Sequence, residues 1–220
     1  MTPVAPLEAR WRPAESQGDD PRSERVSGAL VLLHGRGADE HDLYPLLDLL
    51  DPERRLLGVS PQGPLELPPG GRHWYALGGI PTPDPATFAA TAPRLAAFLD
   101  GLPVPSDRVV LGGFSQGTVM SYAMSLGPGR PRPAGLVAMS GFLPRVADWP
   151  LHPERLRGVP VGIAHGSLDP VIPAQFAVEA EATLTAAGAD VLRLSSPVPH
   201  MVDPDWIEPL RDLVARATAD

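Results

Sequence analysis

The chain has 220 residues, of which 43% are apolar and 20% are charged, and its formal net charge is -8. These values are typical of one globular domain with a full core, and they exclude intrinsic disorder, collagen-like repeats and a coiled coil for the whole chain. An acidic chain without a local basic patch is not expected to bind nucleic acid. Because the chain contains no cysteine, disulfides, thiolate metal sites and cysteine nucleophiles are excluded.

The N-terminal residues 1–20 lack the apolar core of a secretory signal, because Pro3, Pro6 and Pro13 interrupt them and Glu8 is charged. No stretch approaches the roughly 18 apolar residues that span a bilayer. We therefore expect a soluble, cytoplasmic protein without an integral membrane segment. A single domain is predicted over 1–220, with a strand and loop region at 1–26.

The first half of the chain starts with a polar turn or loop at 14–25 and continues with alternating strand and helix patterns. Short apolar runs bounded by turn residues are typical of strands buried on both faces. Such runs lie at residues 29–33, at 55–60 as a weaker candidate, and at 108–113. Between them, Asp84 followed by Pro85 suits the start of a helix. Pro93 inside that helix predicts a kink or a late start.

The second half of the chain repeats the alternation. Helices are predicted at 115–126, 173–187 and 205–217, and strands at 135–139, 159–164 and 189–194. Strands alternating with helices of this length predict an α/β fold, a mostly parallel sheet with helices on both faces. Ligands bind such sheets beyond the carboxyl ends of the strands. The Pro- and Gly-rich segments 61–85 and 142–160 do not fit the alternation, and we expect them to be active-site loops.

The sharpest motif is the Gly-Phe-Ser-Gln-Gly sequence at 113–117, which matches G-x-S-x-G. It lies between a predicted strand and a predicted helix, which is the context that a serine nucleophile on a tight turn requires. The two glycines let neighbouring chains approach without a Cβ clash, and the new helix directs free N–H groups at the site. Ser115 is therefore the candidate nucleophile; the alternative is a chance match in a glycine-rich chain.

A serine nucleophile needs a base, and the base needs an orienting acid. Asp169 directly follows the predicted strand at 159–164, and His200 follows the one at 189–194. Serine, acid and histidine in this order, each after a strand, match the arrangement that accompanies the motif. The bland alternative is that Asp169 is only a turn residue before Pro170.

Other histidines and acids are weaker candidates because of their positions. His34 and His165 precede the serine and the acid, respectively, and we expect His165 to hydrogen-bond within its own turn. His41 and His152 are expected on the surface. Asp190 begins a strand and Asp203 follows the candidate base, so neither is well placed.

The Gly-rich sequence at 34–37 follows the first buried strand and is the candidate second half of an oxyanion hole. We expect the backbone N–H groups of Arg36 and Gln116 to be its donors. The alternative is that this turn only connects a strand to a helix, with His34 as a packing residue. A metal site is a weaker alternative; its ligands would be His34, Asp39, His41 and Asp42.

Three segments in order resemble the phospholipase/carboxylesterase family, the α/β-hydrolase group that includes acyl-protein thioesterases and small bacterial carboxylesterases. They are LHGRGAD at 33–39, GFSQG at 113–117 and HGSLDPVIP at 165–173, and the resemblance runs from about Leu30 to the C-terminus. It implies an α/β-hydrolase fold and a Ser-Asp-His hydrolase of carboxylic ester or thioester bonds. It further implies no cofactor or metal, a small-molecule substrate, and a monomer or homodimer.

The chain departs from the family pattern at three places. Thr118 stands where many members have a second small residue, and Pro199 precedes His200 where glycine is frequent. The segment 76–79 lacks the acidic residue that is common there. The segment before it, Trp74 and Tyr75, is similar to an aromatic pair that the family places before its acyl pocket.

Aromatic and apolar residues in the irregular segments are candidates for the substrate pocket. They are Trp74, Tyr75, Phe142 and Leu143, with Met201 beside the candidate base and Trp149 in the second loop. The alternative is that these side chains only cover the core. We expect a carboxylesterase or lysophospholipase-like activity on short to medium acyl chains. The alternatives are a thioesterase, an acyltransferase or perhydrolase on the same triad, and a non-catalytic binding module.

Overall fold

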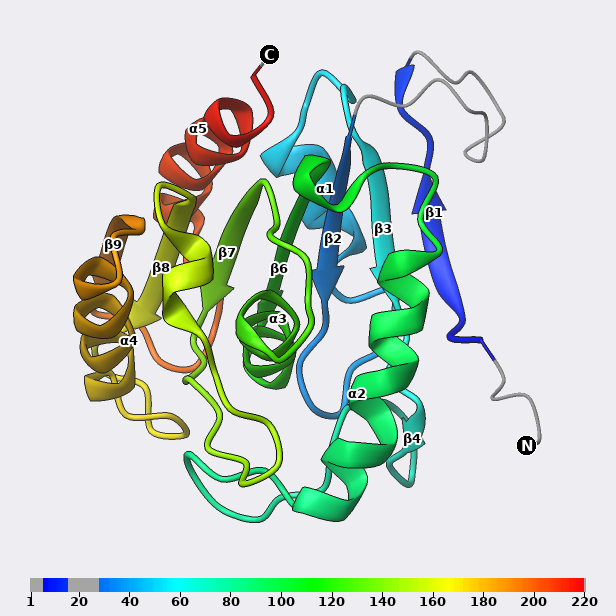
Figure 1. Cartoon of the computed structure of the whole chain (residues 1–220), viewed down its shortest axis with the longest axis vertical. Helices are drawn as coiled ribbons and strands as arrows, with labels where there is room; N and C mark the ends of the chain where they lie inside the picture. Colours follow the sequence, from blue (N-terminus) through cyan, green and yellow to red (C-terminus); the bar gives the residue numbers. More distant parts are fainter. Residues whose placement is uncertain (1–5, 16–27, 220) are drawn as a thin grey trace.

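A computed structural model describes residues 6–15 and 28–219 of the chain. Within these residues, seven strands form one twisted sheet (Figure 1). In spatial order they are β1 (Ala9–Arg12), β3 (Leu57–Pro61), β2 (Ala29–Leu33), β6 (Val109–Phe114), β7 (Gly135–Met139), β8 (Pro160–Gly166) and β9 (Asp190–Ser196). Neighbouring strands are parallel except for β1, which pairs antiparallel with β3 at the edge.

The strands predicted from sequence are all present, with ends shifted by at most two residues. The N-terminal strand region contains β1, whereas most of the loop expected at 14–25 lies outside the described residues. A buried ion pair fastens β1 to the molecule: the Arg12 guanidinium lies 2.6 Å from the Asp51 carboxylate. The same guanidinium donates from its two NH₂ groups to the carbonyl oxygens of Leu47 and Leu56, so its charge is paired and both of these groups have acceptors inside the protein.

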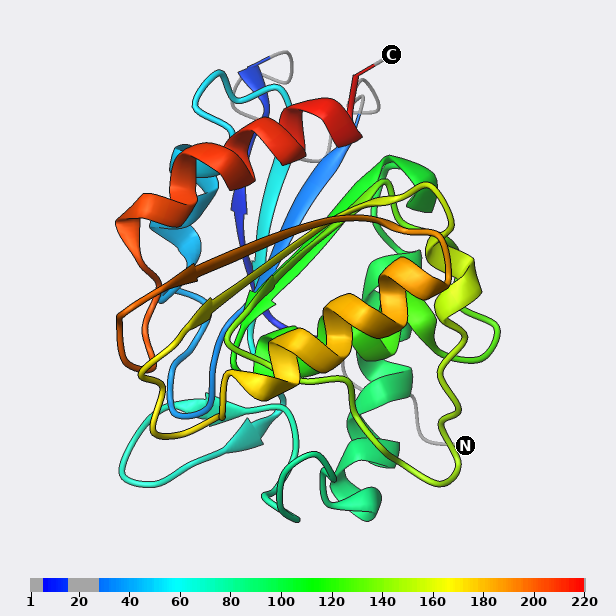
Figure 2. The ribbon, with the colours of Figure 1, turned by 90° about the vertical axis from the view of Figure 1, so that its left-hand side faces the viewer.

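Helices cover both faces of the sheet, as predicted (Figure 2). One face carries α1 (Tyr44–Leu50) and α5 (Ile207–Ala217), and the other carries α2 (Pro85–Asp100), α3 (Gln116–Leu126) and α4 (Gln175–Ala186). Sequence patterns did not predict α1, a short helix without a side-chain cap at its start. The helix predicted at 205–217 is a 3-10 turn at Pro204–Trp206 that leads into α5.

Pro93 does not delay the start of α2, so the late start considered from sequence is wrong. The helix begins at Pro85, where the Asp84 carboxylate accepts a hydrogen bond of 2.9 Å from the Thr87 N–H. It then continues through Pro93. Pro93 and Ala89, whose carbonyl loses its helical partner there, are both exposed. Water can therefore satisfy that carbonyl, which lowers the cost of the proline.

Alternate residues of the central strands build two apolar cores. Leu30 and Leu32 pack with α1 and α5, while Val31 and Leu33 pack with the opposite helix layer. Such burial on both faces explains the continuous apolar runs in the sequence. Within the described residues, no helix is both long and apolar enough to cross a membrane.

The two irregular segments are ordered and attached to the core. The segment 61–85 contains a two-stranded hairpin of β4 (Leu65–Glu66) and β5 (Arg72–His73). The segment 142–160 lies along α3, where the Trp149 indole donates to the Ala123 carbonyl at 3.1 Å. The Trp149 ring also meets Phe88 edge-on at 5.7 Å between centroids. Trp149 is therefore a packing residue.

Candidate active site

Ser115 occupies the tight turn between β6 and α3, with backbone angles φ 54° and ψ -116°. A non-glycine residue with positive φ is strained and persists only where its surroundings hold it. A Cβ atom at Gly117 would overlap the carbonyl oxygen of Leu33, and one at Gly113 would overlap the backbone of Gly117. Both glycines of the motif are thus required by close backbone approach, as the sequence predicts.

The structure brings the three predicted side chains into one hydrogen-bonded chain. His200 Nε2 lies 3.0 Å from Ser115 Oγ, and His200 Nδ1 lies 2.6 Å from Asp169 Oδ2. The Phe114 ring supports the imidazole, with ring centroids 4.7 Å apart. In this geometry an ionised carboxylate accepts from Nδ1–H, which leaves Nε2 free to accept the serine proton.

The Asp169 carboxylate is set up to remain ionised. Burial alone raises its pKa, but hydrogen bonds from His200 and from the backbone outweigh burial, and the net effect lowers the pKa. The backbone donors are the N–H groups of Val171 and Ile172, at 2.8 and 2.9 Å from Oδ1. These two bonds fix the orientation of the carboxylate toward the imidazole.

His165 lies beside the hydrogen-bonded side chains of Ser115, His200 and Asp169 without being part of that series. Its Nε2 lies 2.8 Å from the Ile172 carbonyl oxygen and 3.4 Å from Asp169 Oδ2. The predicted hydrogen bond within its own turn is confirmed. Burial lowers the His165 pKa, which favours the neutral ring. His41 is exposed, as predicted, whereas His152 is at the surface but half-buried.

The turn that contains Arg36 is held by the β4–β5 hairpin. The Gly37 N–H donates to the Arg72 carbonyl at 2.8 Å, and the Arg72 N–H donates to the Ala38 carbonyl at 2.7 Å. Gln116 is the first residue of α3, so its N–H has no acceptor within the helix. Arg36 and Gln116 line the same cavity as Ser115, which is where oxyanion donors are required.

Polar side chains fasten the first loop to this turn. His34 Nε2 accepts from the Gly63 N–H at 2.8 Å, and the Trp74 indole donates to the His34 carbonyl at 2.9 Å. The Gln116 amide accepts from the Trp74 N–H at 3.1 Å and donates to the Tyr75 carbonyl at 2.9 Å. This second role of Gln116 was not predicted from the sequence. No local signal reveals it, because its partners are some forty residues away.

A cavity of about 240 Å³ opens directly over Ser115 and His200. Two predicted pocket residues, Tyr75 and Phe142, are on its wall. The wall is mostly apolar, which suits an acyl chain. The lining residues that the sequence did not predict are Leu77, Gly79, Ile80, Val171 and Ile172.

The structure does not bring the other predicted pocket residues to this cavity. Trp74 is fully buried behind it, against His34, with 5.2 Å between ring centroids. Leu143 lines a neighbouring cavity. Met201 is 44% exposed and is not part of the lining. The sequence cannot show which aromatic and apolar loop residues line the cavity, because tertiary hydrogen bonds decide which way a loop residue faces.

Comparison with known proteins identifies the group to which this fold and this geometry belong. The sequence model of the Phospholipase/Carboxylesterase family matches residues 20–215. The chain belongs to the phospholipase/carboxylesterase family. The match includes every segment that contributes to the serine, histidine and aspartate cluster, so the resemblance seen in three motifs extends over nearly the whole chain.

Curated relatives of this family member include acyl-protein thioesterases. Acyl-protein thioesterase 1 of Schizosaccharomyces pombe is 33% identical over 104 residues, which are 45% of this chain and 46% of that protein. Acyl-protein thioesterase 1 of Cryptococcus neoformans var. neoformans is 28% identical over 172 residues, 70% of this chain and 71% of that protein. The matches to the first three relatives span only 29% to 46% of their lengths.

Solved structures of similar fold include esterases. The Bacillus cereus carboxylesterase has a TM-score of 0.76 at 20% identity, covering 96% of this chain and 94% of that one. Esterase PE8 has a TM-score of 0.74 at 25% identity, covering 97% and 100%. The α/β-hydrolase fold predicted from the sequence is therefore confirmed.

The departure from the family pattern at Thr118 has a structural explanation. The Thr118 hydroxyl accepts from the Met139 N–H at 2.9 Å and lies 2.6 Å from the Gly113 carbonyl oxygen. It thereby links α3 to the ends of both β6 and β7. A slightly larger polar residue fits here because Gly141, on the next loop, has no Cβ to overlap it.

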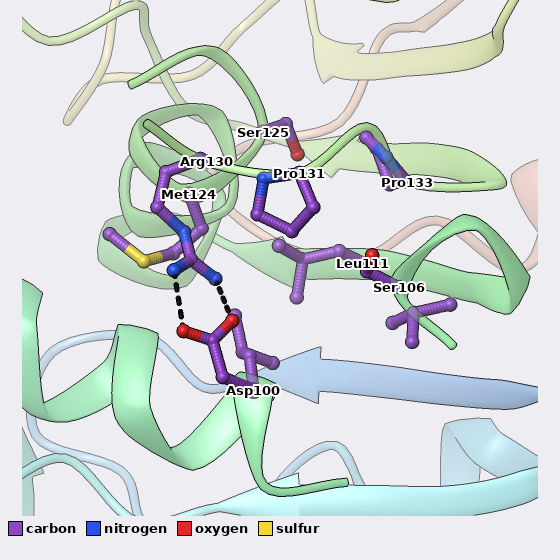
Figure 3. A pocket seen from close by; sticks show the side chains of 10 residues that line it. Asp100, Ser106, Leu111, Met124, Ser125, Arg130, Pro131 and Pro133 are labelled. Atoms are coloured by element: carbon purple, nitrogen blue, oxygen red, sulfur yellow. Dashed lines mark hydrogen bonds and ion pairs between the residues drawn. The ribbon is translucent and has the colours of Figure 1, made fainter. Parts of the chain in front are cut away.

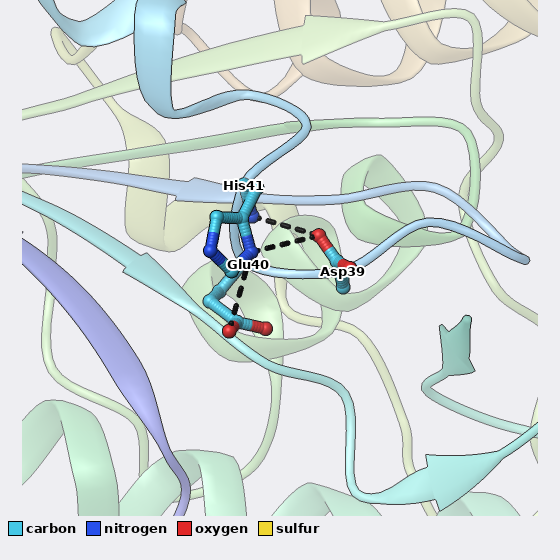
Figure 4. Close-up of side chains that lie close together, drawn as sticks. All are labelled: Asp39, Glu40 and His41. Carbon is cyan, nitrogen blue, oxygen red and sulfur yellow. Dashed lines mark hydrogen bonds and ion pairs between the residues drawn. The ribbon is translucent and has the colours of Figure 1, made fainter. Parts of the chain in front are cut away.

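The metal ligands considered from sequence are not assembled as a set. Both ring nitrogens of His34 are within hydrogen-bond distance of backbone groups, at Gly35 and Gly63. Asp39, Glu40 and His41 do lie together, with ligand atoms within 4.8 Å of one another (Figure 4). The His41 ring lies 3.2 and 3.3 Å from the two carboxylates, which is the geometry of a surface hydrogen-bonded cluster.

A small cavity of about 30 Å³ lies at the opposite end of β6 from Ser115. Arg130 spans one side of it and makes two hydrogen bonds to Asp100, of 3.0 and 2.8 Å (Figure 3). Its volume is that of about one water molecule. It is therefore too small to hold a substrate.

Proposed function

We propose that this family member is a serine hydrolase that cleaves carboxylic esters with short to medium acyl chains. The observation that supports it best is the chain of contacts from Ser115 Oγ to His200 Nε2, 3.0 Å, and from His200 Nδ1 to Asp169 Oδ2, 2.6 Å, beneath an apolar cavity. The cytoplasmic location, the small-molecule substrate and the monomeric or homodimeric state stay predictions.

The proposed reaction has two acyl-transfer steps. His200, oriented by Asp169, accepts the Ser115 proton as Oγ attacks the ester carbonyl carbon. The N–H groups of Arg36 and Gln116 hold the oxyanion, and His200 then gives the proton to the leaving alcohol. Water repeats the cycle on the acyl-enzyme and releases the carboxylic acid. The strained Ser115 backbone keeps the hydroxyl directed at the cavity throughout.

A thioesterase activity is a second candidate, because the curated relatives are acyl-protein thioesterases. The same residues would serve, since a thiol leaving group needs less protonation than an alcohol. Turnover of S-butyrylthiocholine and p-nitrophenyl butyrate at matched concentrations separates the two. Products formed after addition of an alcohol or peroxide reveal acyltransferase or perhydrolase activity.

Replacement of the nucleophile tests the proposal directly. We expect Ser115→Ala to lower kcat for p-nitrophenyl butyrate by a factor on the order of 10⁶, as in other serine hydrolases. Ser106→Ala, at the far end of β6, is the matched control and should retain activity. Labelling by a fluorophosphonate probe should disappear only in Ser115→Ala. Full turnover by that variant, or an unlabelled wild type, would contradict the proposal and favour a binding module.

A further inference from the structure

A second cavity, of about 300 Å³, lies next to the one over Ser115. Three segments of the chain contribute to the walls of both cavities. Ile80, Phe142 and Ile172 line the first cavity. Pro81, Leu143 and Phe176, which follow them closely in the sequence, line the second. The second cavity is lined by Pro81, Leu143, Pro144, Arg145, Leu151, Phe176, Glu179, Ala180 and Thr183. The two cavities are therefore adjacent and share one partition.

The partition between them is a pair of aromatic rings. Phe142 and Phe176 pack with centroids 5.8 Å apart and planes tilted by 52°. Phe142 is only 3% exposed. The backbone before it is held because the Ser140 N–H donates to the Ala164 carbonyl at 2.8 Å and Gly141 packs tightly on Thr118. Phe142 is thus a fixed end wall of the first cavity.

The second cavity has the chemistry of an acyl-chain site. Its base is formed by apolar side chains from the loop after β7 and from α4. Its polar groups are at the outer rim, where the Arg145 guanidinium lies 3.7 Å from the Glu179 carboxylate and both side chains are exposed. The Arg145 N–H also donates to the Pro81 carbonyl at 3.0 Å, which joins two of the shared stretches. An acyl chain bound in this cavity would be buried, and a polar group at its far end would be exposed to water at the rim.

We propose that Phe142 sets the upper limit of acyl length and that the second cavity is an extension of the acyl site that Phe142 closes. With the carbonyl carbon at Ser115, a short acyl chain ends against the Phe142 ring, behind which Phe176 packs. A longer chain has to pass them to reach the second cavity. This inference rests on the proposed function, since it assigns the substrate class of the same site.

Truncation of the partition tests the inference. We expect Phe142→Ala to move the maximum of kcat/KM in a p-nitrophenyl ester series from butyrate toward decanoate and dodecanoate. Each additional methylene that becomes buried should raise relative kcat/KM by about fourfold. Phe142→Leu, which preserves more of the packing, should give a smaller shift in the same direction and keeps the test available if the alanine variant fails to fold.

Filling the second cavity provides the complementary test. Thr183 lines it from an exposed position on α4, so a tryptophan there should enter the cavity without disturbing the core. We expect Phe142→Ala combined with Thr183→Trp to return the profile toward short chains. The matched control is Phe98→Ala, which removes a similar ring that packs against Trp11 and lines neither cavity, and it should leave the chain-length profile unchanged.

The outcomes separate this inference from the proposed function. An active Phe142 variant with an unshifted chain-length profile overturns the inference alone. The inference is also overturned if adding Thr183→Trp to Phe142→Ala does not return the profile toward short chains. The longer acyl chain would then lie outside the second cavity. A wild type that is not labelled by the fluorophosphonate probe overturns the proposed function itself.

Discussion

Asp169 shows how one residue combines sequence signals with contacts that only the fold provides. Its position after a strand and before Pro170 marks it as a candidate acid. Its two carboxylate oxygens, however, have separate partners: Oδ1 accepts from backbone N–H groups, whereas Oδ2 faces the His200 ring. This division orients the carboxylate and keeps its pKa below the ordinary value despite burial.

Replacing Asp169 by asparagine should impair the base without disturbing the fold. The amide oxygen would accept from the Val171 and Ile172 N–H groups, which would turn the NH₂ group toward His200 Nδ1. The imidazole would then carry its proton on Nε2 and could not accept one from Ser115. We expect a loss in kcat on the order of 10⁴ for p-nitrophenyl butyrate, as for the equivalent change in other triads.

The control for this change is Asp212→Asn on the exposed side of α5, which should have wild-type kinetics. Melting temperatures of the two variants and the wild type report on folding. A loss of less than about tenfold in a folded Asp169→Asn protein would show that another group orients His200.

Among the elements, α3 contributes most to the site, because it begins directly after Ser115 and all of its residues are buried. Its first turn is fixed by glycines that allow close approach and by Thr118, which bridges β6 and β7. Strand and helix patterns predicted this element well. They did not predict the Thr118 contacts, because both partners are backbone groups of neighbouring strands.

Thr118→Val should destabilise the protein through two backbone groups. The Met139 N–H would lose its acceptor and the Gly113 carbonyl would lose a donor in a buried environment. We expect the free energy of unfolding to fall by about 1–3 kcal/mol, measured by urea denaturation. Thr118→Ser retains the hydroxyl and should lose less. Equal stability of the valine and serine variants would show that the hydroxyl contacts contribute nothing.

Across the whole molecule, buried neutral histidines couple folding to pH. Desolvation lowers the pKa of His34 and His165 below the ordinary 6.5. His34 has a further reason to stay neutral, since its Nε2 accepts from the Gly63 N–H and a proton there would face another proton. Both histidines lie in segments that form the candidate active site. Neutral rings at these positions therefore maintain both the fold and the cavity.

Stability should therefore decrease as the pH falls below about 6.5. Unfolded histidines bind protons from that pH downward, while the folded ones resist until a lower pH, so folding loses up to about 1.4 kcal/mol per pH unit for each histidine. Asp169 acts in the same direction at lower pH, since its folded pKa lies below 3.8. Urea denaturation at pH 7.5, 6.5 and 5.5 measures the decrease.

His34→Asn should be less stable than the wild type at pH 7.5 but should lose less stability on going to pH 5.5. His41→Asn, at an exposed position, should match the wild type at each pH. An unchanged pH dependence in His34→Asn would show that His34 does not contribute to this coupling.

Local signals sufficed for the parts of this protein that depend on neighbours in the chain. Apolar runs, turn residues and the glycines around Ser115 determined the strand and helix order and the G-x-S-x-G turn, because hydrophobic burial and backbone sterics act over a few residues. The order of strands then placed Ser115, Asp169 and His200 beyond the carboxyl ends of the parallel strands, which lie on the same side of the sheet.

The tertiary structure alone decided which loop side chains reach the cavity. Trp74 faces inward because its indole N–H donates to the His34 carbonyl. Trp149 faces α3 because its indole N–H donates to the Ala123 carbonyl. Leu77 and Ile80 line the cavity although nothing in their segment distinguishes them from other loop residues. Buried polar groups must find partners, and in these loops the partners come from distant segments that the sequence does not reveal.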